Sequence, residues 1–141
     1  MEDDYAVASR ILDATKSIAV VGASDNPARD SHRVTAYLDA VGFEVHPVNP
    51  NAERVVGLRC VASLGVLGHE GVAIDTVVSF RRSEEIEPIA EAAIAIVAHH
   101  LWMQFGVVNQ AAALRARGAG MLVVMDRCIM VDHRRLLLTR R

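Results

Sequence analysis

Apolar runs rich in β-branched residues alternate along this chain with alanine-rich stretches of helical period. Five runs are expected to be strands, at residues 17–22, 43–48, 74–80, 101–104 and 121–125. Between them, apolar residues recur one helical turn apart, as Val34, Tyr37, Leu38 and Val41 do. This alternation is typical of repeated βαβ units with right-handed crossovers. It predicts an α/β fold with a doubly wound, mainly parallel five-stranded sheet and helices on both faces.

Length and composition fit a single domain over residues 1–141. A chain of 141 residues is long enough to bury one core. Aromatic residues make up only 4% of the chain and apolar residues 52%, so Ala, Val, Ile and Leu are expected to fill that core. We expect an amino-terminal helix within residues 1–15 and, because arginines accumulate at the other end, a solvated basic tail over residues 136–141.

Charge and hydropathy exclude several classes of partner. A formal charge of −2 is too close to neutral for a general nucleic-acid binder, which carries a strong excess of Lys and Arg. No run approaches the roughly 20 apolar residues that cross a bilayer, and the acidic start has no apolar leader behind it. We therefore expect a cytoplasmic protein with no membrane partner. Cys60 and Cys128 lack CxxC spacing, so neither a disulfide nor a metal site is expected.

Local signals predict where the helices begin. Asp30 or Ser31 is expected to cap the second helix, and Asn109 to cap a helix that runs to residue 117. Residues 83–86 are expected to form a turn, with the next helix beginning near Glu87 and Pro88 at its first position. Residues 58–61 are expected to form a short extended piece, followed by a short helix capped by Ser63.

The turn after the first strand, residues 22–27, is the candidate anion site. Ligands of doubly wound sheets bind at the carboxyl ends of the strands, and a Gly-containing turn before a helix offers free amides to a phosphate. The dinucleotide fingerprint is absent, because Gly22 is followed by Ala, Ser, Asp, Asn and Pro. The second strand also lacks an acid placed to hold a nicotinamide ribose. A nucleotide other than NAD is therefore favoured.

Five blocks of sequence together resemble a known family. They are Ile-Ala-Val-Val-Gly-Ala-Ser at 18–24, Pro-Val-Asn-Pro at 47–50, Phe-Arg-Arg at 80–82, Leu-Trp-Met-Gln-Phe-Gly-Val at 101–107 and Val-Met-Asp-Arg-Cys at 124–128. The chain resembles the small single-domain CoA-binding proteins, which are similar to the CoA-binding domain of the succinyl-CoA synthetase α subunit. The resemblance covers residues 16–135. It implies a Rossmann-type domain that carries CoA or an acyl-CoA across the strand ends.

The resemblance also implies which positions contact the ligand. They are Gly22, Ala23 and Ser24 in the phosphate loop; Ser31, His32 and Arg33 at the start of the next helix; Asn49 and Pro50 after strand two; Phe80, Arg81 and Arg82 after strand three; and Gln104 and Gly106 after strand four. The arginines offer planar forks suited to phosphate oxygens. Two departures concern the phosphates: Asp30 places an acid near them, and Asn51 stands where synthetase-like relatives often have Lys.

No residue is expected to be catalytic or to bind a metal. His99 and His100 adjoin in a strand and so point to opposite faces, while His69 and His133 are expected at the surface. Trp102 is expected in the core. Cys128 follows the fifth strand, and its expected role is packing. A mixed disulfide with the CoA thiol is the alternative.

Non-catalytic binding of CoA or an acyl-CoA is the favoured function. The synthetase relatives need a phosphorylated histidine from another domain, which a chain of this length does not contain. An NAD(P)-linked oxidoreductase or a CoA-transfer subunit acting with a partner is the alternative, and an interaction scaffold with vestigial CoA binding is a third. A protein partner or a homo-oligomer is compatible with each hypothesis.

Overall fold

A five-stranded parallel sheet forms the centre of the computed structural model, which describes residues 2–140. Its strand order is β2–β1–β5–β6–β7, and every neighbouring pair is parallel. The strands are β1 (Ser17–Val21), β2 (Glu44–Val48), β5 (Thr76–Ser79), β6 (His100–Met103) and β7 (Leu122–Val124). β2 lies on one side of β1, and the later strands β5, β6 and β7 lie in order on its other side. The switch point of the topology therefore lies between β1 and β5.

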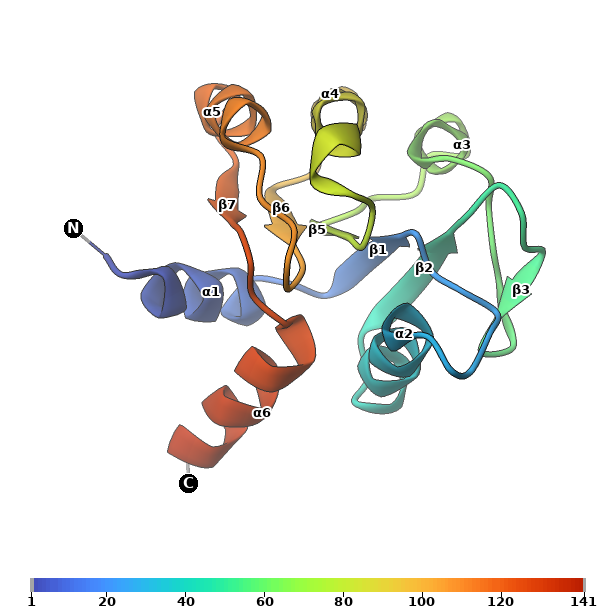
Figure 1. Cartoon of the computed structure of the whole chain (residues 1–141), viewed down its shortest axis with the longest axis horizontal. Helices are drawn as coiled ribbons and strands as arrows, with labels where there is room; N and C mark the ends of the chain where they lie inside the picture. Colours follow the sequence, from blue (N-terminus) through green and yellow to red (C-terminus); the bar gives the residue numbers. More distant parts are fainter. Residues whose placement is uncertain (1, 141) are drawn as a thin grey trace.

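Helices cover both faces of the sheet (Figure 1). One face carries α1 (Asp4–Asp13), α2 (Asp30–Ala40) and α6 (Ile129–Thr139). The other carries α3 (Leu64–His69), α4 (Ile86–Ala95) and α5 (Gln110–Gly118). The predicted doubly wound α/β fold is confirmed. A small antiparallel hairpin of β3 (Arg54–Val55) and β4 (Leu58–Arg59) lies beyond β2, and Val61 forms a bridge with Val48.

Buried strands divide the core into two layers. Every residue of β1, β5 and β6 is buried. Successive residues of a strand point to opposite faces: Ala19 packs toward the α3–α5 layer, whereas Ile18 and Val20 pack toward α1, α2 and α6. Trp102 is fully buried in the second layer, as predicted, and its indole nitrogen donates to the Arg127 carbonyl at 2.8 Å.

Two of the predicted helix starts differ from the structure by one or two residues. Arg29, not Asp30 or Ser31, is the N-cap of α2, and it makes no side-chain capping bond, so the helix starts one residue early with its first amides uncapped. Residues Ser83–Glu85 form a 3-10 turn and α4 begins at Ile86, which places Pro88 third rather than first. Proline is tolerated there because amides of the first turn need no intrahelical acceptor. The Asn109 cap of α5 is confirmed by its bond from the Ala112 amide.

Residues 136–139 of the expected basic tail form the end of a helix, and residue 141 lies outside the described residues. α6 runs to Thr139 and buries Ile129, Asp132 and Leu136. Two arginines at this end contact α1. The guanidinium of Arg135 lies 3.7 Å from the centre of the Tyr5 ring, and Arg140, the C-cap of α6, pairs with Asp13. Basic residues are therefore part of the contact between the two ends of the chain. None of the described helices is long and apolar enough to cross a membrane.

Candidate ligand-binding site

The loop after β1 lies at the switch point of the sheet, between the carboxyl ends of β2 and β5. Gly22 turns the chain there with a φ of +84°, a left-handed conformation that favours glycine. A Cβ atom at this position would lie 3.2 Å from Cδ of Arg81 and 3.4 Å from Cβ of Phe80. The absence of a side chain therefore lets the loop after β5 approach the loop after β1.

Hydrogen bonds from β2 fix this loop. The Gly22 amide donates to the Val48 carbonyl at 2.9 Å, so this amide is not free for a ligand. The side-chain amide of Asn49 donates to the Ala23 carbonyl at 2.7 Å, and its oxygen accepts from the Asn51 amide at 2.8 Å. The amides of Ala23 and Ser24 donate to no atom within residues 2–140. The amide of Ser24 is therefore an unpaired donor of this loop, whereas that of Ala23 belongs to a fully buried residue.

The start of α2 adds further free donors beside this loop. The amides of Asp30 and Ser31 have no acceptor among the described residues. The next two amides, those of His32 and Arg33, donate to the Arg29 carbonyl. Ser31 is buried, and His32 is half-buried in the same first turn. The positive end of the α2 dipole therefore faces the region after β1, where an anion is favoured.

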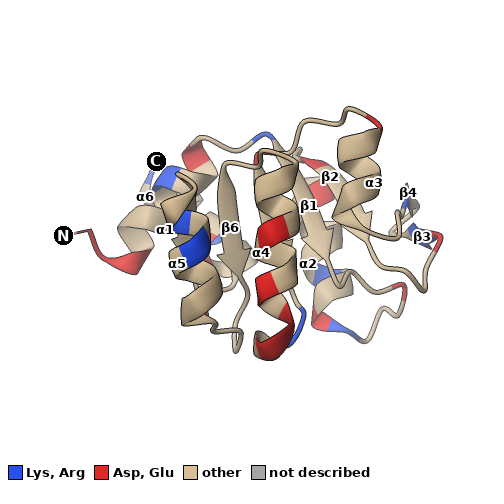
Figure 2. Ribbon diagram, turned by 90° about the horizontal axis from the view of Figure 1, so that it is seen from above, with Lys and Arg blue, Asp and Glu red and all other residues tan. Residues whose placement is uncertain are grey.

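The predicted arginines are exposed and paired with acids. Arg33 pairs with Asp30, and Nε of Arg81 donates to Glu85 at 2.9 Å. Arg82 is the most open of them, at 78% side-chain exposure, and lies 3.5 Å from Glu85. Acidic residues line α4 and its approach (Figure 2), so the guanidinium groups stand next to carboxylates at the rim of the site. Exposed pairs of this kind are weak and can exchange partners.

Three hollows follow the carboxyl edge of the sheet. A small hollow of about 230 Å³ is lined by Gly22, Asn49, Phe80, Arg81, Arg82 and Glu85. On the α3–α4 side, a cavity of about 680 Å³ shares Gly22 and Arg81 with it and reaches Pro50 and the start of α3. On the other side, a cavity of about 550 Å³ between α2 and α6 shares Phe80 with it. We call the last one the α2–α6 cavity.

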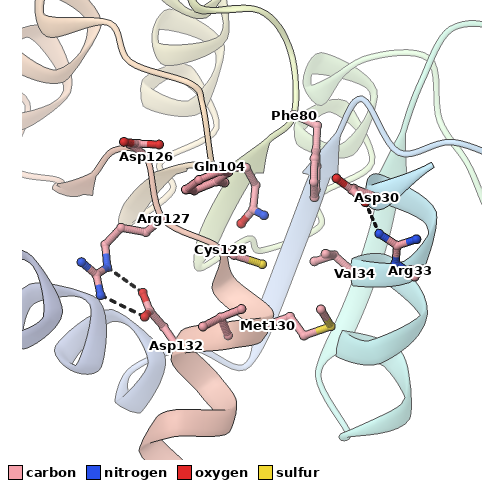
Figure 3. A pocket seen from close by; sticks show the side chains of 12 residues that line it. Asp30, Arg33, Val34, Phe80, Gln104, Asp126, Arg127, Cys128, Met130 and Asp132 are labelled. Atoms are coloured by element: carbon pink, nitrogen blue, oxygen red, sulfur yellow. Dashed lines mark hydrogen bonds and ion pairs between the residues drawn. The ribbon is translucent and has the colours of Figure 1, made fainter.

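The α2–α6 cavity has apolar walls and a few polar groups (Figure 3). Gln104, which is only 2% exposed, lies at its base, and its side-chain oxygen accepts from the Ile129 amide at the start of α6. Arg127 and Asp132 form a two-bond ion pair of 2.7 and 3.0 Å at one wall, which raises the pKa of Arg127. Phe105 is 80% exposed at the rim, and Cys128 faces the interior.

The predicted contact residues divide into two groups. Those that line one of the three hollows are Gly22, Arg33, Asn49, Pro50, Phe80, Arg81, Arg82 and Gln104. Ala23, Ser24, Ser31, His32 and Gly106 line none of them. Ala23 is fully buried, and the Gly106 amide is held by the Asp126 carboxylate at 2.7 Å. Gly106 thus shapes the loop after β6 rather than facing the hollows.

The remaining titratable residues with unusual surroundings lie away from this edge. His100 is buried at the start of β6, where Nδ1 bonds to the Thr76 hydroxyl at 2.9 Å, and burial lowers its pKa. His99 is exposed and precedes β6, and its ring centre lies only 6.1 Å from that of His100, so the predicted placement of the two side chains on opposite faces of a strand is not confirmed. His133 is not at the surface as expected: it is half-buried against Tyr37 and Phe43. No group of three potential metal ligands occurs within residues 2–140.

Sequence reasoning missed the contribution of α6 to the site. Met130, Val131 and Asp132 line the α2–α6 cavity, but no element was predicted for the residues between the fifth strand and the expected tail at 136–141. A usable signal was present, because Ile129, Asp132 and Leu136 recur with the spacing of one helix face. The start of α3, which lines the α3–α4 cavity through residues 62–65, was also not assigned to the site.

Known relatives share both the sequence and the fold. The chain is 41% identical over 123 residues to an uncharacterized Bacillus subtilis protein, YneT. The alignment covers 87% of this chain and 89% of YneT. The structure of a hypothetical protein from Pyrococcus horikoshii OT3 has a TM-score of 0.87 and 35% identity, covering 97% of this chain and 99% of that one. These similarities extend over nearly the whole chain.

A weaker similarity links the chain to part of an enzyme. Over 64 residues it is 36% identical to the ADP-forming acetate–CoA ligase II of Archaeoglobus fulgidus, an alignment that spans 43% of this chain and 10% of the ligase. The family model described as "CoA binding domain" matches residues 16–134, which include all five of the sequence blocks that carry the resemblance. The chain therefore belongs to the CoA binding domain family.

Proposed function

We propose that this protein binds CoA or an acyl-CoA non-catalytically at the carboxyl ends of its sheet, with the ligand's phosphates on the loop after β1. The observation that carries the proposal is the arrangement around Gly22. A left-handed glycine at the switch point is followed by the unpaired amide of Ser24 and by the uncapped start of α2. Membership of the CoA binding domain family supplies the ligand class.

The charges of CoA fit the charged groups at this edge. CoA carries a pyrophosphate and a 3′-phosphate, and Arg33, Arg81 and Arg82 surround the loop from two sides. In the free protein each of them is paired with an exposed or half-exposed carboxylate. A phosphate offers a stronger, two-pronged acceptor for a guanidinium, so ligand binding would replace these surface pairs at little cost.

The rest of CoA fits the hollows on either side. Asn49 and Pro50 border the β2 side, where the nucleotide would lie, while Phe80 connects the small hollow to the α2–α6 cavity. The apolar walls of that cavity suit the pantetheine arm. Phe80 would then lie where the arm leaves the phosphates.

Calorimetry with a panel of nucleotides tests the proposal. CoA and acetyl-CoA are expected to bind saturably with a thermal stabilisation of the protein, since a ligand that binds only the folded state raises its stability. 3′-Dephospho-CoA is expected to bind more weakly, because one phosphate contact is lost. NAD and NADP serve as controls. The proposal fails if CoA gives neither heat nor stabilisation, and a preference for NAD would favour an oxidoreductase instead.

A CoA-transfer subunit acting with a partner is the second candidate, supported by the similarity to part of an acetate–CoA ligase. It requires a partner that supplies the acyl-transfer residues. Native mass spectrometry of the protein purified from its own cells separates the candidates: a stoichiometric protein partner favours this one, and a chain that carries only CoA favours the binding role.

A further inference from the structure

The α2–α6 cavity contains the more accessible of the two thiols of the chain. Cys128 is half-buried at the N-cap of α6, and its sulfur points into the cavity between Gln104 and Met130 (Figure 3). Cys60 differs in every relevant respect. It is buried, its sulfur lies 3.6 Å from the Asn49 carbonyl, and burial raises the pKa of its thiol. Only Cys128 is therefore presented to a molecule in the cavity.

A second feature of the same cavity points independently to a ligand. Gln104 is 2% exposed, and its oxygen is occupied by the Ile129 amide. Its side-chain nitrogen donates to no atom of residues 2–140 and lies on the cavity side, above the sulfur of Cys128 (Figure 3). Among the buried side-chain polar atoms of the described residues only the Tyr5 hydroxyl lacks a partner, so the Gln104 nitrogen is a donor open to the cavity. An amide carbonyl of a pantetheine arm would provide one, with Val34, Phe80 and Met130 as its apolar surroundings.

We propose that Cys128 is a thiol–disulfide exchange site that captures CoA from CoA disulfide; this rests on the proposed function. In the exchange the Cys128 thiolate attacks one sulfur of the bound disulfide. The CoA–CoA sulfur bond breaks, a bond forms between Sγ of Cys128 and one CoA, and the other CoA leaves as a thiolate that takes up the proton lost by Cys128. One disulfide replaces another, so no further oxidant is needed.

The position of the cavity makes this exchange specific for a CoA disulfide. Phe80 lines both the α2–α6 cavity and the hollow beside Gly22, so a ligand whose phosphates lie on the loop after β1 directs its sulfur end toward Cys128. Binding thus holds the reacting sulfur near the thiol, and Gln104 acts as a positioning residue for the arm. The covalent form keeps CoA in the site until another thiol releases it.

Intact-protein mass spectrometry tests the exchange. The full chain is incubated with CoA disulfide, and in parallel with glutathione disulfide at the same concentration, which has the same chemistry but no nucleotide. We expect a mass increase of one CoA less two hydrogen atoms, located on Cys128 by peptide mapping, with Cys60 unmodified. The reaction with CoA disulfide should be roughly tenfold or more faster than with glutathione disulfide, because binding orients the reactants. Desulfo-CoA, which lacks the sulfur, should slow it.

Two variants and one binding measurement complete the test. Cys128→Ser should give no adduct. Gln104→Glu keeps the acceptor for the Ile129 amide but removes the donor. Its added carboxylate should slow both exchanges, because it disfavours a nearby thiolate. The exchange with CoA disulfide should be slowed by the larger factor, because only that exchange uses the donor. The proposal is overturned if the reduced protein binds CoA reversibly yet Cys128 reacts no faster with CoA disulfide than with glutathione disulfide. Absence of reversible CoA binding would overturn the proposed function itself.

Discussion

Gly22 combines a left-handed backbone with a close approach to the loop after β5. A substitution there should therefore affect both the stability of the protein and its affinity for CoA. Gly22→Ala should lower the free energy of unfolding by about 1–2 kcal/mol, the usual cost of a left-handed backbone for a residue with a Cβ. It should also weaken CoA binding roughly tenfold, because the new Cβ lies 3.2 Å from Cδ of Arg81 and displaces that side chain. Urea unfolding and calorimetry measure the two effects.

Gly42 provides the matched control. Its φ is +102°, so alanine should cost similar stability there, but a Cβ at Gly42 would meet nothing within 4 Å and the residue lies at the opposite end of α2. Gly42→Ala should therefore keep its affinity for CoA. Equal affinities of the two variants would remove Gly22 from the binding site.

Residue types were easier to predict than the bonds they make. Asn49 was expected beside the ligand, and it does line the small hollow, but its side chain is used to tie Ala23 to Asn51. Gly106 was expected as a contact, yet its amide is held by Asp126. The bonds from Asn49 to Ala23 and from Gly106 to Asp126 join residues from different loops. Their partners depend on how the strands are ordered, which a local pattern does not specify.

The helix α6 was not predicted from the sequence, and a buried ion pair connects its first turn to the rest of the protein. Asp132 is buried and accepts two bonds from Arg127, whose carbonyl in turn accepts from Trp102. Asp132→Asn should lower the free energy of unfolding by roughly 2–3 kcal/mol, somewhat less than a fully buried pair, because Arg127 keeps some contact with water. Urea unfolding followed by circular dichroism measures it.

A surface pair of the same helix is the comparison for that change. Asp13→Asn breaks the exposed pair between Arg140 and α1, and its effect on the free energy of unfolding should be much smaller. If the two variants lose equal stability, the Arg127–Asp132 pair contributes no more than a surface contact, and the anchoring of α6 must come from its apolar face.

At the scale of elements, the central strands β1, β5 and β6 were predictable because they are buried on both faces and therefore have long apolar runs. Helix ends were less so. The α2 start lacks the side-chain cap that its Asp30 and Ser31 suggested. This departure from the local rule occurs at the candidate site, where the uncapped amides are left for a ligand. Local rules commonly fail at such positions.

For the whole molecule, two partly or fully buried histidines predict how stability depends on pH. Burial lowers the pKa of His100, whose ring bonds to Thr76, and of His133 in α6, which packs against Tyr37 of α2 and against Phe43. The unfolded chain therefore binds protons more readily than the folded one. Stability should be fully present above the ordinary histidine pKa, near 6.5, and should decrease as the pH falls below it.

Urea titrations at pH 8, 7, 6 and 5 measure this dependence, and variants assign it. The carboxylates whose pKa is lowered, such as Asp13 by its bond to Arg140 and Glu70 by its bond to Arg59, change stability mainly below their ordinary values of 3.8 and 4.5, outside this window. His100→Gln and His133→Gln should each flatten the decrease between pH 6.5 and 5, whereas His69→Gln, at an exposed position, should retain it. A decrease that persists unchanged in the double variant His100→Gln/His133→Gln would mean that protonation of other groups destabilises the fold, because these two are the histidines whose burial opposes a charge.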